Sequence, residues 1–180
     1  MNWKYVVDSS VILRRTKHDI YEHESFPIHW DNFDKLIQEG IIISVPLVKD
    51  EINNHPKRKL LDWPKLNDLI FQNLDDNVVN ASNILSSRFE EWYEFNKEED
   101  KPWADPQLIA FAMAYNIALV TQEGWNPNAT EEHNYKIPTI CSKLGAYCRI
   151  NNKESEDVDQ TTPFQCIDFF ELIKREELYK

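Results

Sequence analysis

Short, mainly apolar runs alternate along the chain with segments whose apolar residues fall at helical spacing. The runs at 3–7, 41–45 and 117–120 have the length and composition of strands that are covered on both faces of a sheet. Helical spacing follows the first run at 30–37 and precedes the third at 108–113. Strands that alternate with helices are typical of a parallel sheet, so we expect an α/β fold.

Helix boundaries are marked by proline, glycine and aspartate. Pro46 is expected to open the helix after the second strand, and Gly40 to close the helix before it. Asp105 followed by Pro106 indicates an N-cap with proline at the first helical position. This helix and the strand after it place Asp105 at one end of a unit whose other end carries Thr121 and Glu123.

The remaining segments give weaker patterns. We expect 55–96 to be largely helical, with Leu60, Leu61, Leu66, Leu69, Val78, Val79, Ile84, Leu85, Phe89 and Trp92 among its apolar positions. Residues 137–144 indicate a strand end that runs into a helix, 147–150 an edge strand, and 151–161 a flexible acidic loop. Thr162-Pro163 is expected to cap a last amphipathic helix that carries Phe164, Ile167, Phe170 and Ile173.

Composition limits the classes of protein that need to be considered. The 180 residues predict a single domain spanning 1–180, and neither a membrane span nor a signal peptide is visible, so we expect a cytoplasmic protein. The three cysteines form no C-x-x-C pair and are interpreted as reduced, buried thiols, and the histidines lack zinc-ligand spacing. The three glycines form no phosphate-binding loop, which excludes the glycine-rich nucleotide folds.

Net charge argues against broad attraction of a polyanion. Twenty Lys and Arg residues stand against 31 Asp and Glu, a formal charge of −11. An acidic surface of this kind usually serves to keep a protein soluble. Any nucleic-acid site must therefore be a local exception to the overall negative charge.

Four acids come from separate elements, yet each is expected at the carboxyl end of a strand or in a first helical turn near one: Asp8, Glu51, Asp105 and Glu123. In a parallel sheet these positions converge, and carboxylates that converge must either bind protons or bind cations. Hard oxygen ligands select Mg²⁺ or Mn²⁺, and a pair of such ions supports phosphodiester hydrolysis. Ser10 and Thr121 are expected in the second shell of the site.

Each acid also has an ordinary interpretation. A helix cap explains Asp105, a helix-surface acid explains Glu51, and a turn residue explains Glu123. Asp8 is harder to explain structurally, because an acid that ends a buried strand needs no capping role. The order of all four is what favours a shared site.

That order resembles the PIN-domain ribonucleases. Val6-Val7-Asp8-Ser9-Ser10 is similar to the family's opening motif, and Val48-Lys49-Asp50-Glu51-Ile52 to its glutamate-bearing helix. Ala104-Asp105-Pro106-Gln107-Leu108 resembles the third acidic motif, and Thr121-Gln122-Glu123 the strand-end Thr-x-Asp, here with Glu as the fourth acid. The closest resemblance is to a bacterial PIN-like subfamily of unknown function, toxin-like in character, and it extends over nearly the whole chain.

The resemblance implies a three-layer α/β/α sandwich with a central parallel sheet and Mg²⁺- or Mn²⁺-dependent cleavage of RNA. It makes Asp8, Glu51, Asp105 and Glu123 both the catalytic and the metal-binding residues. It also implies that the chain is the toxin of a toxin-antitoxin pair, with a small antitoxin protein as partner and homodimers common. Products would carry 5′-phosphate and 3′-hydroxyl ends.

Substrate contacts and rival functions remain open in the sequence. Arg14-Arg15 and Lys57-Arg58-Lys59 are either phosphate-binding margins or solvated charged turns, and Trp103 either stacks a base or steadies a helix start. The alternative to a nuclease is a non-catalytic PIN-like interaction module that binds an antitoxin-type protein. A phosphatase or phospho-acceptor domain is a third hypothesis, weakened because Ser10 stands where a D-x-D motif would place its second aspartate.

Overall fold

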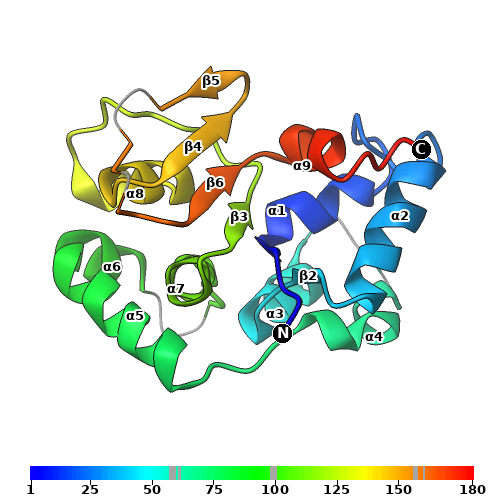
Figure 1. Cartoon of the computed structure of the whole chain (residues 1–180). Helices are drawn as coiled ribbons and strands as arrows, with labels where there is room; N and C mark the ends of the chain where they lie inside the picture. Colours follow the sequence, from blue (N-terminus) through cyan, green and yellow to red (C-terminus); the bar gives the residue numbers. More distant parts are fainter. Residues whose placement is uncertain (57–59, 61, 98–100, 156–157, 160) are drawn as a thin grey trace.

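The computed structural model describes residues 1–56, 60, 62–97, 101–155, 158–159 and 161–180 (Figure 1). The chain is an α/β protein, a three-layer α/β/α sandwich around a central, mostly parallel sheet. Its elements within these residues are β1 (Tyr5–Val7), α1 (Ser9–Ile12), η1 (Leu13–Arg15), α2 (Pro27–Gln38), β2 (Ile42–Ile43), α3 (Pro46–Asn54), α4 (Trp63–Leu66), η2 (Asp68–Ile70), α5 (Asp76–Arg88), α6 (Glu90–Asn96), α7 (Asp105–Tyr115), β3 (Ala118–Val120), η3 (Glu132–Asn134), α8 (Ile137–Lys143), β4 (Tyr147–Ile150), β5 (Lys153–Glu154), β6 (Gln165–Ile167) and α9 (Phe169–Arg175).

The strand order is β2-β1-β3-β6-β4-β5, and all neighbours are parallel except β4 and β5. Val7 pairs with Val120, and Val120 pairs with Ile167, so β1, β3 and β6 end level with one another. The residues that follow, Asp8 and Thr121, therefore lie side by side at the carboxyl end of the parallel strands. The expected apolar strands form here because their side chains are buried on both faces.

Helices cover both faces of the sheet. In Figure 1, α7 and α8 lie on one side of β3 and β6, and α9 and α2 lie on the other side. On the second side, the Trp30 ring of α2 stacks on Phe169 of α9 with centroids 4.8 Å apart. Among the described residues, none of the helices combines the length and the apolar character that crossing a membrane demands.

The last helix expected from the sequence is present, but it begins later than predicted, at Phe169. Gln165–Ile167 is a strand, β6, and it lies inside the sheet between β3 and β4. The following helix, α9, is capped by Asp168, whose Oδ1 accepts a hydrogen bond from the Glu171 N–H at 2.8 Å, so Thr162-Pro163 caps nothing. Phe164 and Ile167 are buried by neighbouring strands and helices rather than by a helical face, and Phe170 is exposed.

The expectations for 55–96 and 137–161 hold only in part. The first segment forms α4, α5 and α6 with a short 3₁₀ turn, and Pro64 lies in the first turn of α4. Of its expected core, Leu61 lies outside the described residues, and four members are exposed: Leu66, Leu69, Val79 and Ile84. Ile137 begins α8 directly, without a strand end, and β4 is an inner strand because β5 pairs on its far side. All three cysteines are free, buried thiols, as expected.

Candidate active site

Four carboxylates line one cleft of about 360 Å³ at the carboxyl end of the sheet: Asp8, Glu51, Asp105 and Glu123. Asp8 follows β1, Glu123 lies beyond β3, and Glu51 and Asp105 come from α3 and α7. The structure thus brings together all four acids that the sequence singled out. Their proximity also appears in the electrostatics, because the charges of the other three all raise the pKa of Asp105.

Asp8 is held by three hydroxyl groups. Its Oδ2 accepts hydrogen bonds from Ser10 at 2.5 Å and from Thr121 at 3.0 Å, and its Oδ1 accepts one from Ser9 at 3.3 Å. Asp8 is only 4% exposed, so these donors replace the water that a carboxylate would otherwise bind. Asp8 is also the residue before α1, but its side chain makes no capping hydrogen bond, which leaves it directed into the cleft.

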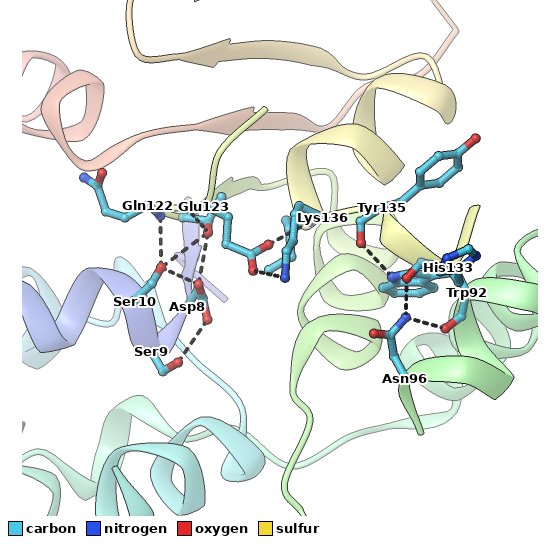
Figure 2. A network of polar contacts seen from close by, with 12 residues as sticks. Asp8, Ser9, Ser10, Trp92, Asn96, Gln122, Glu123, His133, Tyr135 and Lys136 are labelled. Atoms are coloured by element: carbon cyan, nitrogen blue, oxygen red, sulfur yellow. Dashed lines mark hydrogen bonds and ion pairs between the residues drawn. The ribbon is translucent and has the colours of Figure 1, made fainter. Parts of the chain in front are cut away.

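The two main hydroxyl donors are themselves oriented by the backbone after β3 (Figure 2). Ser10 Oγ accepts from the Gln122 N–H at 3.0 Å, and Thr121 Oγ1 accepts from the Glu123 N–H at 3.1 Å. Because each oxygen accepts on one side, its proton is directed to Asp8. Ser10 and Thr121 therefore fix the orientation of the Asp8 carboxylate.

Glu51 joins α3 to the start of α7. Its Oε1 accepts a hydrogen bond from the Ala104 N–H at 2.8 Å, directly before the helix that carries Asp105. Burial raises the pKa of Glu51 from 4.5 to about 7, and the charges of Asp8 and Glu123 contribute, while hydrogen bonds from Ser9 and Ala104 oppose the rise. Near neutral pH this carboxyl is therefore poised between its two protonation states.

Glu123 is tied to α8. Its Oε2 accepts from the Ile137 N–H at 2.8 Å, and its Oε1 lies 3.9 Å from Lys136 Nζ (Figure 2). Burial and the charge of Asp8 raise the pKa of Glu123, while these two partners lower it. The extra methylene of glutamate is thus used to reach the first residue of α8 while the carboxylate stays in the cleft.

Asp105 is not the N-cap of α7 that the sequence had predicted. Ala104 occupies the N-cap position, Asp105 is the first residue of α7, and Pro106 follows it. Burial raises the pKa of Asp105 well above its usual range, and Glu123, Asp8 and Glu51 raise it further. A capping role therefore does not explain Asp105, although a carboxylate at a helix start also benefits from the helix dipole.

The donor set fits a hard divalent cation. Asp8, Glu51, Asp105 and Glu123 offer carboxylate oxygens alone, the ligands that Mg²⁺ and Mn²⁺ prefer. Within the described part of the chain, no three His, Cys, Asp or Glu side chains already surround one point at ligand distances. Burial first, and the charges of neighbouring acids second, raise the pKa values of Glu51, Asp105 and Glu123, and carboxylates that repel one another have no reason to close without a cation between them.

The opposite wall of the cleft was not predicted from the sequence. It consists of Trp92, Asn96, Tyr135 and Lys136, with Lys101 to Trp103 at the rim. Trp92 Nε1 donates to the Tyr135 carbonyl at 3.0 Å, and Asn96 Nδ2 donates to the Trp92 and His133 carbonyls, which fixes α6 against the segment after Glu123 (Figure 2). The contacts with Tyr135 and His133 join positions 43 and 37 residues apart, so no local pattern marks them.

Neither predicted arginine lines the acidic cleft. Arg15 is buried, makes two hydrogen bonds to Asp34 at 2.8 and 3.0 Å, and lies over the rings of Trp30 and Trp63 at about 5 Å. Arg14 pairs with Asp19 at 3.2 Å. The structure thus assigns Arg15 to packing between helices rather than to phosphate binding. The basic run at 57–59 lies outside the described residues.

Comparison with known families gives one match. The family described as Domain of unknown function (DUF4411) matches residues 5–155, which carry all four acids. No curated protein and no solved structure matches the chain.

Proposed function

The chain belongs to the DUF4411 family, and from its cleft we propose that it is a metal-dependent endoribonuclease that hydrolyses RNA phosphodiester bonds. The observation that carries the proposal is the convergence of Asp8, Glu51, Asp105 and Glu123 on one cleft. Their order along the chain also resembles that of PIN-domain ribonucleases. We extend the proposal to a cytoplasmic toxin with an antitoxin protein partner, on that resemblance alone.

The four acids would hold Mg²⁺ or Mn²⁺, which when bound activates water and stabilises the leaving oxygen. The chain's own groups prepare the site. Ser10 and Thr121 fix the orientation of Asp8, and the Ala104 and Ile137 N–H groups fix Glu51 and Glu123. Lys136, 3.9 Å from Glu123, supplies positive charge at the cleft for a phosphate group.

Calorimetric titration of Mn²⁺ into the metal-free protein tests the site without a known substrate. We expect saturable binding by the wild type and at least a hundred-fold loss in Asp105→Asn. The matched control is Asp50→Asn, an exposed acid on the same helix as Glu51 that does not line the cleft, which should bind as the wild type does. Cleavage of total RNA at low salt in Mg²⁺ should follow the same order among the three proteins.

The second candidate is a non-catalytic module that binds an antitoxin-type protein. The net charge of −11 favours it, since such a chain attracts RNA poorly. If the wild type neither binds Mn²⁺ nor cleaves RNA at low salt, the nuclease proposal is wrong and this module takes its place.

A further inference from the structure

Trp103 lines the acidic cleft and contacts one of its four acids. It stands two positions before Asp105, the first residue of α7. The sequence leaves two roles open for its ring, which either stacks a base or steadies a helix start. The contacts of Trp103 favour a more specific role, because they reach the carboxylate of Asp105 as well as the rings of α6.

The Asp105 carboxylate receives its hydrogen bond from the Trp103 side chain. Hydroxyl or backbone N–H groups support the other three carboxylates of the cleft. Burial first, and then the charges of these three acids, raise the pKa of Asp105, and a hydrogen bond from Trp103 opposes that rise. An indole has one polar group, its Nε1–H, which can only donate. The Trp103 indole N–H therefore supports the charged form of Asp105.

Two aromatic neighbours from α6 hold the ring of Trp103. Its centroid lies 4.8 Å from the ring of Trp92, edge-on, and 5.8 Å from the ring of Tyr93. Trp92 is only 1% exposed and is itself fixed, because its Nε1–H donates to the Tyr135 carbonyl at 3.0 Å. A ring that is already packed loses little further freedom when its N–H bonds a carboxylate. The packing on α6 therefore orients the donor that Asp105 uses.

The backbone between this donor and its acceptor serves a second acid. Ala104, which lies between Trp103 and Asp105, is buried and donates its N–H to Glu51 Oε1 at 2.8 Å. Three consecutive residues thus set the positions of two of the four carboxylates. A shift of the Trp103 ring would be felt by both of them.

We propose that Trp103 is a positioning residue of the acidic cleft, whose indole N–H, oriented by the rings of α6, holds the Asp105 carboxylate in place for a divalent cation. This inference rests on the proposed nuclease function. Without the indole N–H, the Asp105 side chain loses a partner that restrains its rotation and favours its charged form. Removal of a group that orients a metal ligand typically weakens metal binding about 10–100-fold.

Trp103→Phe separates positioning from packing, because phenylalanine keeps an aromatic ring against α6 but has no N–H group. Mn²⁺ calorimetry and urea unfolding are carried out on the full chain at one pH. We expect Mn²⁺ binding to be about ten-fold weaker in Trp103→Phe under conditions in which the variant is fully folded. Trp103→Leu, which also removes the ring, should lose stability as well as affinity.

The matched control is Trp3→Phe. The ring of Trp3 packs edge-on against Phe111 and Tyr115, and Trp3 does not line the cleft. This variant should bind Mn²⁺ as the wild type does. An equal loss of affinity in Trp3→Phe and Trp103→Phe would show that any tryptophan replacement disturbs the site, which would overturn the proposal.

NMR of the metal-free protein in EDTA tests the hydrogen bond without a cation. Each of the six tryptophans contributes one indole N–H signal, and Trp103→Phe identifies the signal of Trp103 by its loss. Asp105→Leu removes the acceptor but keeps a side chain of similar shape. We expect the Trp103 signal to move upfield and to exchange faster with water in Asp105→Leu, while the Trp3 signal stays unchanged.

The two measurements keep this inference apart from the nuclease proposal. A Trp103 signal that is the same in the wild type and in Asp105→Leu would overturn the inference, whether or not metal binds. If Asp105→Asn loses Mn²⁺ binding but Trp103→Phe binds as the wild type does, only the role of Trp103 is refuted. If the wild type binds no Mn²⁺, the nuclease proposal is refuted, and positioning for a cation is refuted with it even where the indole signal responds.

Discussion

Replacing Glu51 by glutamine should stabilise the metal-free protein at neutral and alkaline pH, but not at acidic pH. Burial and the charges of Asp8 and Glu123 raise the pKa of Glu51 from 4.5 to about 7 in the folded chain. In the unfolded chain the Glu51 carboxyl is in water, where its pKa is near 4.5. The folded state therefore loses stability as the pH rises from about 4.5 to about 7, and the loss is complete above that range.

The size of the effect follows from the displaced pKa. Each pKa unit corresponds to about 1.4 kcal/mol, so the ionised carboxylate costs the fold about 3 kcal/mol at pH 8. Glutamine has no charge at any pH, and its amide oxygen can still accept the hydrogen bond from the Ala104 N–H at 2.8 Å. The substitution therefore removes the unfavourable charge while keeping the link between α3 and α7.

Urea unfolding of wild type and Glu51→Gln in EDTA, at intervals from pH 4 to 8, measures this difference. We expect the two curves to coincide near pH 4 and the variant to be about 3 kcal/mol more stable at pH 8. Asp50→Asn, on the exposed side of the same helix, should follow the wild type at every pH. If Glu51→Gln is equally or less stable than the wild type at pH 8, Glu51 does not carry an electrostatic penalty in the cleft, and the argument is refuted.

Three other substitutions, one next to the cleft and two elsewhere in the fold, are tested by urea unfolding. Thr121→Val removes a buried hydroxyl that serves Asp8 and the Glu123 N–H, and should cost about 1–3 kcal/mol and weaken Mn²⁺ binding at least ten-fold. Arg15→Met leaves Asp34 without its bidentate partner and should cost about 3 kcal/mol. Gly145→Ala should cost about 2 kcal/mol or more, since φ is +87° and a Cβ would lie 2.6 Å from Asp159 Cβ.

Each of the three has a matched control. Thr121→Ser retains the hydroxyl and should keep most of the metal affinity, so an equal loss in both variants would contradict a role for the hydrogen bond. Lys17→Met changes an exposed cation on the same stretch as Arg15 and should be neutral. Gly124→Ala meets no atom within 4 Å, and a cost equal to that of Gly145→Ala would argue against the steric explanation.

The acidic cleft could be predicted from the sequence because its geometry follows from strand order. Asp8 and Thr121 come directly after strands whose apolar runs are unbroken, and parallel pairing of Val7 with Val120 places them together. Glu51 and Asp105 follow from helix starts that Pro46 and Pro106 mark. What the sequence could not reveal was the hydrogen bonding of Glu51 to Ala104, the N-cap of α7, and of Glu123 to Ile137, the first residue of α8.

β6 was not predicted because the local spacing of apolar residues favours a helix, whereas the tertiary contacts hold the segment as a strand. Phe164, Ile167, Phe170 and Ile173 repeat at helical spacing, but Gln165–Ile167 is held extended by β3 and β4, which are far away in the chain.

The role predicted for Arg15 was wrong because it too depends on contacts that are distant in the sequence. Its charge suggests a surface residue, and only the folded chain reveals the two tryptophans and the aspartate that surround its guanidinium.

The position of β6 also bears on how the acidic cleft is supported. The family match ends at residue 155, yet β6 fills the space between β3 and β4. Without Gln165–Ile167, β3 and β4 would both present unpaired edges, and α8, which binds Glu123 through Ile137, would keep its packing on β4 but lose its packing on β6. The support that α8 gives to Glu123 thus depends in part on a strand that lies beyond the segment matched by the family.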